Sequence, residues 1–225
     1  MIAFDKVTKV YSVSKDMRVT AVHEISLEVA RGEFVVVTGR SGSGKTTLLN
    51  LAAGLTQPTS GRVMLDGQDL WQMSDRQRSV LRAEKVGFVF QFPSLLPSLT
   101  VLENVSLPAI FQPNGARHDA GGHARELLEQ VGLAPKASVY PRQLSAGQQQ
   151  RVVIARALFN QPEVLLADEP TSDLDEQTER EIMELFAQIH AQTGLTVVLV
   201  THTTQLVSYG TRAVRMAEGQ IVPAT

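Results

Sequence analysis

The chain has 225 residues, of which 43% are hydrophobic, and its formal net charge is −2. This length and hydrophobic content suffice for one or two compact units with a real core. The charge argues against a protein that coats nucleic acid, and the lack of cysteine in the sequence excludes disulfides and thiolate metal sites. Asp5 and Lys6 come too early for a signal peptide, and the longest apolar runs have only the length of a strand.

Strands and helices are predicted to alternate along the chain. Alternating apolar residues in Ile2–Tyr11 and Val19–Val29 predict antiparallel strands, and the β-branched run Phe34–Thr38 predicts a buried strand. Ser74–Glu84 is a predicted polar helix with Ser74 as its N-cap. The other predicted elements are the turn Arg31–Glu33, helix Thr47–Ala53, strand Arg62–Leu65, turn Asp66–Gly67, strand Val86–Phe90, strand Val164–Ala167, helix Glu176–Gln192, strand Thr196–Val200 and a hairpin centred on Glu218–Gly219.

Residues 92–161 have a different texture, in which prolines and glycines punctuate helical stretches. This indicates a mostly helical subdomain at 92–161, inserted into a catalytic core made of 1–91 and 162–225. Strands that alternate with helices predict an α/β core with parallel strands and right-handed connections. We therefore expect one domain over 1–225.

Gly39–Thr46 fits the phosphate-loop pattern G-x-x-x-x-G-K-[ST], between a predicted strand and a predicted helix. Glycines let successive backbone N–H groups point at one anion, and the helix adds the positive end of its dipole. Lys45 can reach the β- and γ-phosphates, and the Thr46 hydroxyl can bind Mg²⁺. This setting favours a nucleoside triphosphate site over an ordinary glycine-rich turn. The predicted ATP-binding residues here are Gly39, Arg40, Ser41, Gly42, Ser43, Gly44, Lys45, Thr46 and Thr47.

Two adjacent acids, Asp168 and Glu169, end the predicted strand Val164–Ala167. A strand directs neighbouring side chains to opposite sides, so the two carboxylates are suited to different roles. In phosphate-loop enzymes the strand-end Asp holds Mg²⁺ through its water shell. Glu169 can orient or deprotonate the attacking water. The structural alternative is a solvated strand end.

Leu144–Arg151 reads Leu-Ser-Ala-Gly-Gln-Gln-Gln-Arg, with Ser145 at a predicted helix start. A hydroxyl and backbone N–H groups at such a start can bind an anion, and a plain helix cap is the alternative. The stretch resembles the signature motif of ATP-binding cassette (ABC) ATPases, usually written L-S-G-G-Q. The residues after it look like the helix that carries this motif in that family.

The resemblance extends over nearly the whole chain and implies the phosphate-loop NTPase fold of ABC ATPases. That fold has a parallel α/β core, an N-terminal antiparallel β subdomain and a helical signature subdomain. The resemblance also implies that Gln91 contacts the Mg²⁺ and water region and that His202 contacts the γ-phosphate. It implies that Tyr11 stacks on adenine, where the alternative is a tyrosine packed on the sheet. The alternative for His202 is a polar cap of the strand.

The resemblance implies a site completed by a second copy of the chain, head to tail, with ATP and Mg²⁺ as the bound groups. The implied catalytic residues are Glu169, His202, Gln91 and Lys45, and the implied metal ligands are Thr46, Gln91 and, through water, Asp168. The residues implied to bind ATP in trans are Ser145, Ala146, Gly147, Gln148 and Asp173. Closure on ATP and reopening after hydrolysis follow from contacts that exist only in the closed dimer.

Three positions depart from the usual family pattern, and we expect the core chemistry to survive all three. Ala146 replaces the first glycine of the signature pair, which a helical backbone accepts at little cost. Asp173 places an additional negative charge in the loop that resembles the family's D-loop, Ser172–Asp175. Thr203 follows His202 where an acid is common.

The stretches 18–22, 86–91 and 95–108 resemble the lipoprotein-release and macrolide-export branch of the family. This implies an integral membrane permease as partner, a place on the cytoplasmic face of the inner membrane, and export or extraction of lipoprotein, lipid, drug or peptide. Leu95–Pro97 is the candidate docking loop, and packing into the helical part is its alternative. The other functions considered are a division-linked mechanical signaller, a soluble ABC ATPase that transports nothing and a small-molecule phosphate-loop kinase. No nucleic-acid partner is expected.

Overall fold

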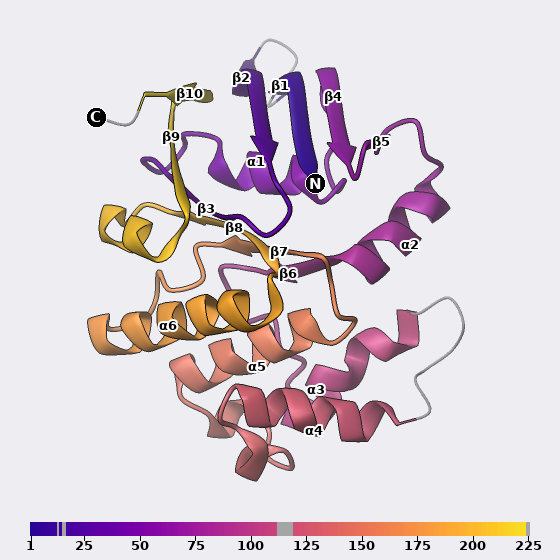
Figure 1. Cartoon of the computed structure of the whole chain (residues 1–225), viewed down its shortest axis with the longest axis vertical. Coiled ribbons are helices and arrows are strands. Elements are labelled where there is room, and N and C mark those ends of the chain that lie inside the picture. The colour runs from indigo at the N-terminus through magenta and orange to yellow at the C-terminus, as the bar shows by residue number, and fades with distance from the viewer. Residues whose placement is uncertain (13, 15–16, 112–118, 224–225) are drawn as a thin grey trace. The chain divides into compact units, whose positions relative to one another are not determined.

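The structure is a computed structural model that describes residues 1–12, 14, 17–111 and 119–223 (Figure 1). The chain divides into two compact units. The first unit comprises Met1–Ser79 and Thr196–Thr225, and the second unit comprises Val80–Leu195. The described part of 92–161 lies within the second unit, and its separation from the rest as a subdomain stays a prediction.

The first unit contains an antiparallel sheet in the order β2-β1-β4-β5. Its strands are β1 (Ile2–Ser12), β2 (Arg18–Val29), β4 (Ser60–Leu65) and β5 (Gln68–Asp69). The antiparallel pairing of β1 with β2 confirms the prediction for the N-terminal ranges. Ile2, Phe4 and Val7 of β1 are buried, as expected for a sheet with one face in the core, and a register shift between Phe4 and Val7 interrupts strict alternation.

Parallel strands form the second sheet layer of the first unit. β3 (Phe34–Thr38) pairs in parallel with β8 (Thr196–Thr201) and with β9 (Arg212–Ala217). β10 (Gln220–Val222) pairs antiparallel with β9, which confirms the predicted terminal hairpin. All residues of β3 and β8 are buried, including Thr38, Thr196 and Thr201, as expected for strands covered on both faces. The 3-10 helix η4 (Thr204–Tyr209) connects β8 to β9.

Two helices begin in the first unit. α1 (Lys45–Ala52) starts two residues earlier than predicted. Its N-cap is Gly44, which has a left-handed conformation, and the sequence pattern did not predict a cap at this residue. α2 (Asp75–Lys85) begins after Ser74, as predicted. The Ser74 Oγ accepts a bond of 3.3 Å from the Gln77 backbone N–H, which confirms the predicted cap.

The second unit packs helices around a parallel strand pair, β6 (Val86–Val89) and β7 (Val164–Asp168). Its helices are α3 (Val101–Ser106), η1 (Leu107–Phe111), α4 (Ala120–Gln130), η2 (Ala134–Lys136), η3 (Pro141–Gln143), α5 (Ala146–Leu158) and α6 (Glu176–Thr193). In Figure 1, α5 lies between α6 and the pair formed by α3 and α4. Gly87 lets β6 approach α5, since a Cβ there would lie 2.5 Å from the Ala157 carbonyl oxygen.

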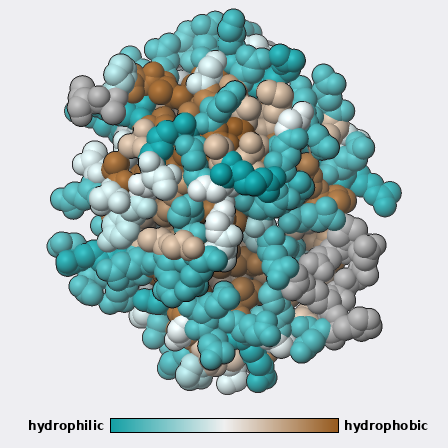
Figure 2. Space-filling model, in the orientation of Figure 1, coloured by the Kyte–Doolittle hydropathy of each residue, from teal (hydrophilic) through white to brown (hydrophobic). Residues whose placement is uncertain are grey.

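The visible face of the molecule is mostly hydrophilic, with hydrophobic residues in small patches (Figure 2). No helix in the described ranges combines the length and the apolar character needed to cross a membrane.

Candidate functional site

The phosphate loop begins at the end of β3. Thr38, the last residue of β3, pairs with Thr201, the last residue of β8. Neighbouring parallel strands lie about 5 Å apart, so Gly39 and His202 leave the first unit's sheet at the same edge. The structure therefore places His202, which is exposed, beside the phosphate loop.

The curl of the loop depends on glycines. Gly42 and Gly44 have φ angles of 80° and 97°, a region that other residues enter at a cost of about 1–2 kcal/mol. A Cβ at Gly44 would collide with the carbonyl oxygen of Ala21 in β2, and a Cβ at Gly39 would collide with that of Met216 in β9. Strands from both sheets of the first unit therefore brace the loop.

The donors of the loop suit a chain of phosphates. The Lys45 Nζ donates to the carbonyl oxygens of Gly39 and Arg40 at 2.8 and 3.2 Å, and the side chain is only 5% exposed. The Ser43 Oγ is buried and, among the described residues, has no hydrogen-bond partner. A buried cation, a hydroxyl without a partner and the N-terminus of α1 together fit a polyphosphate anion.

The exposed residues of the loop include Thr46, in the first turn of α1. A hydroxyl oxygen is a ligand that Mg²⁺ accepts, so Thr46 fits the metal role that the sequence predicted for it. Thr47, also predicted to bind ATP, is half-buried on the same turn. Arg40, Ser41 and Gly42 are exposed at the tip of the loop.

Tyr11 is the last residue but one of β1 (Ile2–Ser12), in the first unit. It pairs with Val19 of β2, two residues before Ala21, which lies against the phosphate loop. The ring is 37% exposed, which disfavours the alternative of a tyrosine packed on the sheet. The Lys9 Nζ lies 4.9 Å from the ring centroid and donates to the Gln57 carbonyl oxygen at 2.8 Å. Stacking of Tyr11 on adenine stays a prediction.

In the second unit, the two predicted acids lie at the carboxyl ends of parallel strands. Val89 of β6 pairs with Ala167 of β7, so Gln91, Asp168 and Glu169 all lie at the carboxyl end of this strand pair. Asp168 is buried, whereas Glu169 is half-buried and has a φ angle of 45°. A left-handed glutamate is uncommon, and such backbone strain concentrates at functional positions. The structure thus brings together three of the predicted residues.

The segment after Gln91 is held by a residue that sequence reasoning missed. The guanidinium of Arg156, in α5, donates to the carbonyl oxygens of Ser94 and Pro93 at 2.9 and 3.2 Å. Burial lowers the pKa of Arg156, yet a guanidinium stays charged at neutral pH. An arginine on a helix gives no sign in the sequence that it reaches a distant loop, so no pattern could have identified it.

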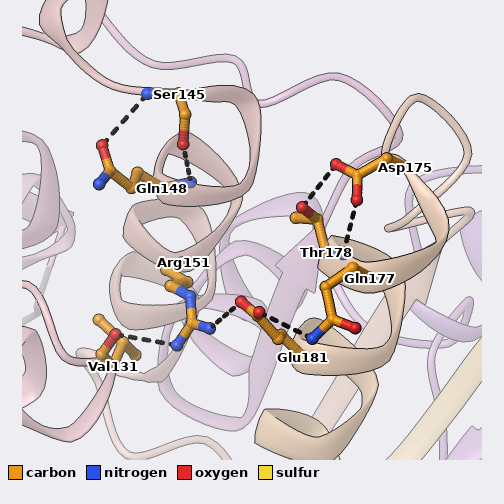
Figure 3. Close-up of polar contacts among 8 residues, drawn as sticks. All are labelled: Val131, Ser145, Gln148, Arg151, Asp175, Gln177, Thr178 and Glu181. Carbon is orange, nitrogen blue, oxygen red and sulfur yellow. Dashed lines mark hydrogen bonds and ion pairs between the residues drawn. The ribbon is translucent and has the colours of Figure 1, made fainter.

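The signature stretch forms the N-terminus of α5. Ser145 is the N-cap: its Oγ accepts from the Gln148 N–H at 3.3 Å, and its own N–H donates to the Gln148 Oε1 at 3.2 Å (Figure 3). This capping box uses one acceptor position of the hydroxyl and leaves its proton able to donate. Ser145 and Ala146 are exposed, whereas Gly147 is buried.

The loop before α6 ends in a second cap. The Asp175 carboxylate accepts from the Thr178 N–H at 3.0 Å and from the Thr178 Oγ1 at 2.6 Å (Figure 3). The hydrogen bond from the Thr178 side chain is the main reason that the pKa of Asp175 lies below its ordinary value. Asp173 is exposed, and its role in a second copy's site stays a prediction.

This fold and these residues at the carboxyl ends of parallel strands define a phosphate-loop nucleoside triphosphatase of the α/β class. Residues 22–172 match the family model described as ABC transporter. The lipoprotein-releasing system ATP-binding protein LolD of Geobacter metallireducens is 46% identical over 215 residues, 96% of this chain and 95% of the relative. The chain therefore belongs to the ABC transporter family, as an ATP-binding subunit with ATPase activity.

Further comparisons agree with this family. The macrolide export ATP-binding/permease protein MacB of Rhodopirellula baltica is 43% identical over 219 residues, 95% of this chain and 32% of that relative. A solved dimer of the ATP-binding cassette MJ0796, in a post-hydrolysis state bound to ADP and Pi, has a TM-score of 0.91 and 40% identity. The match covers 99% of this chain and 97% of the cassette. The predicted fold and family are confirmed.

Proposed function

We propose that two copies of this ATPase close on ATP and drive a separate membrane subunit. The observation that carries the proposal is the strand register, which sets His202 beside the phosphate loop and Gln91 beside Glu169. The carboxyl ends of parallel strands are where α/β proteins bind ligands. We propose that these residues serve one reaction, the hydrolysis of ATP.

Each residue has a role that follows from its chemistry. Lys45 binds the β- and γ-phosphates and offsets the negative charge that spreads over the γ-phosphate oxygens. Glu169 orients the water and accepts its proton, since a carboxylate within hydrogen-bond reach is a suitable base. His202 contacts the γ-phosphate, and Gln91 positions the water.

The same reaction requires a divalent cation. Thr46, Gln91 and, through water, Asp168 are the residues that would hold Mg²⁺, and oxygen ligands of this kind suit it. Bound there, Mg²⁺ would supply positive charge that offsets the charge developing on the phosphates.

The second copy completes the binding of ATP in this proposal. Its Ser145, Gly147 and neighbouring signature residues contact the nucleotide held by the first copy, and Asp173 lies in the adjoining loop. The solved MJ0796 dimer, to which this chain is similar along nearly its whole length, supports the pairing. Contacts made only in the closed dimer shift the population towards closure, and hydrolysis removes them.

The proposals for the membrane partner and the substrate class are based on the names of the relatives. The names of LolD and MacB describe lipoprotein release and macrolide export. We propose a permease partner, a position on the cytoplasmic face of the inner membrane, and export or extraction of lipoprotein, lipid, drug or peptide. Transport names among the relatives favour this function over a mechanical signaller, a soluble ABC ATPase without transport, or a kinase.

The proposed docking surface consists of Phe92 and Leu96, in the segment after β6. Their exposed fractions are 64% and 43%, and Leu95 is half-buried, so the predicted loop is only partly available to a partner. Charge reversal at Glu103, a natural test of docking, is unsuitable. Its carboxylate accepts from the N–H and the Oγ1 of Thr100, both at 2.7 Å, and these bonds lower the pKa of Glu103. Reversal would remove the capping box of α3 together with the charge.

Phe92→Ser is the better test of the docking surface. An exposed aromatic side chain contributes about 2 kcal/mol or more when it anchors an interface, and little when it meets only water. We expect co-purification of a membrane subunit from detergent-solubilised membranes to fall at least about tenfold, with basal ATP hydrolysis unchanged. Recovery equal to the wild type would remove this surface from the proposal.

Ser145→Arg tests the proposed function. A bulky cation at the exposed N-cap of α5 blocks approach of a second copy's nucleotide and leaves the protein's own phosphate loop intact. We expect ATP hydrolysis without any acceptor to fall at least about 10²-fold, while a fluorescent ATP analogue binds with unchanged affinity. A kinase would need an acceptor for turnover and would tolerate the substitution.

Arg142→Ser is the matched control, because Arg142 is also exposed and lies three residues before Ser145, in η3. We expect hydrolysis by this variant to stay within about twofold of the wild type, as for surface changes in general. Equal hydrolysis by Ser145→Arg and the wild type would count against the role of the second copy.

A further inference from the structure

One glycine of the signature turn is buried against α6. Gly147 lies in the first turn of α5, and a Cβ at this position would collide with the Cγ2 methyl of Thr178. The same Cβ would lie 3.8 Å from the Thr178 Cβ and 3.9 Å from its Oγ1, which are ordinary contacts. The conflict therefore involves a single methyl group. Ala146, one residue earlier, is exposed, so its methyl group faces water.

The Thr178 side chain is fixed in the position that fills this space. Its Oγ1 donates to Asp175 at 2.6 Å, and its backbone N–H donates to the same carboxylate at 3.0 Å (Figure 3). A threonine has few accessible rotamers in a helix, and a bound hydroxyl selects one of them. Because the Oγ1 is held on the Asp175 side, the Cγ2 stays directed at Gly147.

A second contact holds the same two helices one turn further along. The Arg151 guanidinium, in α5, lies 3.2 Å from the Glu181 carboxylate in α6 and 3.4 Å from the Val131 carbonyl oxygen (Figure 3). Gln177 donates to the other Glu181 oxygen at 3.2 Å. The start of α5 therefore cannot shift away from α6 without breaking an ion pair.

We infer that Thr178 is a positioning residue for ATP hydrolysis: its γ-methyl, locked by Asp175, sets the place of the signature turn, and this contact is why residue 147 is glycine. The inference rests on the proposed role of the signature turn in hydrolysis. It also agrees with alanine at the first position of the pair, since Ala146 is exposed. The loop that ends at Asp175 and the signature turn are therefore expected to move together.

The test measures the effect of Gly147→Ala in two backgrounds, the wild type and Thr178→Ser. Serine keeps the hydroxyl that bonds Asp175 and lacks the methyl that blocks the new Cβ. In the wild-type background we expect kcat for ATP to fall about 10²-fold, because a displacement of about 1 Å costs that much in rate. In the Thr178→Ser background we expect the loss of kcat caused by Gly147→Ala to be at least about tenfold smaller, since residues in contact are energetically coupled.

Two further readouts separate positioning from general loss of structure. The affinity of a fluorescent ATP analogue should be the same in all four proteins, because the phosphate loop lies in the first unit. Gly121→Ala in α4 is the matched control: among the described residues its added Cβ would meet the Asp119 Oδ1 alone, at 3.9 Å, so kcat should not change. If Gly147→Ala does not fold, recovery of its melting temperature by Thr178→Ser supports the same contact.

A loss of kcat that is equal in both backgrounds would overturn the inference, because residue 147 would then be glycine for the sake of an approaching molecule. Failure of the proposed function is distinguishable from this outcome. It would appear as absent hydrolysis in the wild type or as unchanged hydrolysis in Ser145→Arg, and the melting temperatures of the four proteins would still test the contact between Gly147 and Thr178.

Discussion

Glu169→Gln is expected to slow ATP hydrolysis by about 10³-fold and to accumulate as an ATP-bound dimer. Glutamine has the size of glutamate and keeps an oxygen acceptor, so the fold and ATP binding should persist. An amide cannot take the proton of the attacking water, and general-base catalysis contributes about 10²–10⁴-fold in rate. Phosphate release gives the rate, and size-exclusion chromatography with ATP and Mg²⁺ shows the dimer.

Glu163→Gln is the control for this variant, since Glu163 directly precedes β7 and Glu169 directly follows it. The Glu163 carboxylate pairs with the Lys85 Nζ at 3.0 Å, and both side chains are 32% exposed. Partly exposed pairs of this kind contribute at most about 1 kcal/mol, so we expect stability to fall slightly and hydrolysis not at all. A Glu169→Gln protein that hydrolyses ATP at the native rate would exclude Glu169 as the base.

Local signals in the sequence were enough to predict most elements of the fold. The pair Glu218–Gly219 predicted a hairpin, and both residues have positive φ angles in the structure. Ser74 predicted a helix start, and its Oγ accepts from the Gln77 N–H there. The apolar run Phe34–Thr38 predicts a strand covered on both faces. In each case the physical cause lies within a few residues of the feature, so the pattern carries it.

Contacts between distant segments were beyond prediction. The arginine that holds the segment after Gln91 is Arg156, 62 residues after its acceptor Ser94. The collision of a Cβ at Gly147 with Thr178 depends on how α5 and α6 pack, to which neither residue points by itself. The contact of Lys9 with the Tyr11 ring is local by comparison, because residues two apart on a strand share a face.

The same division holds for the candidate site. Motifs predicted Lys45, Asp168 and Glu169 as site residues because the chemistry of phosphates and Mg²⁺ favours those residue types. Sequence alone could not show that Gln91 and Glu169 follow paired strands, since the pairing of Val89 with Ala167 joins segments far apart in the chain. His202 acquires its place beside the phosphate loop only through the register of β3 with β8.

Lys45→Met is expected to raise the dissociation constant for ATP at least about 10²-fold. Hydrogen bonds to charged groups contribute about 1.5–3 kcal/mol each, and each 1.4 kcal/mol is a factor of about ten. Methionine has a similar length but neither charge nor donor, so it keeps the shape of the loop and loses the contacts with phosphate. Titration with a fluorescent ATP analogue measures the change, and wild-type affinity would contradict the assigned role.

Lys45→Met should change the free energy of unfolding much less than it changes the affinity for ATP. The Lys45 Nζ donates to two carbonyl oxygens, and losing these bonds costs about 1–3 kcal/mol. Removing a charge that is 5% exposed offsets part of this cost, because a buried ion carries a desolvation penalty. The melting temperature should therefore fall by less than about 12 °C, at about 2–4 °C for each kcal/mol lost.

Lys85→Met is the control for a lysine outside the loop, and we expect it to bind ATP like the wild type. Together the variants separate binding from chemistry. Glu169→Gln should bind ATP, fail to hydrolyse it and remain dimeric, whereas Lys45→Met should neither bind nor dimerise when ATP is added. Because closure in the proposed cycle depends on the bound nucleotide, a Lys45→Met protein that dimerises with ATP as readily as Glu169→Gln would show that some other contact drives the pairing.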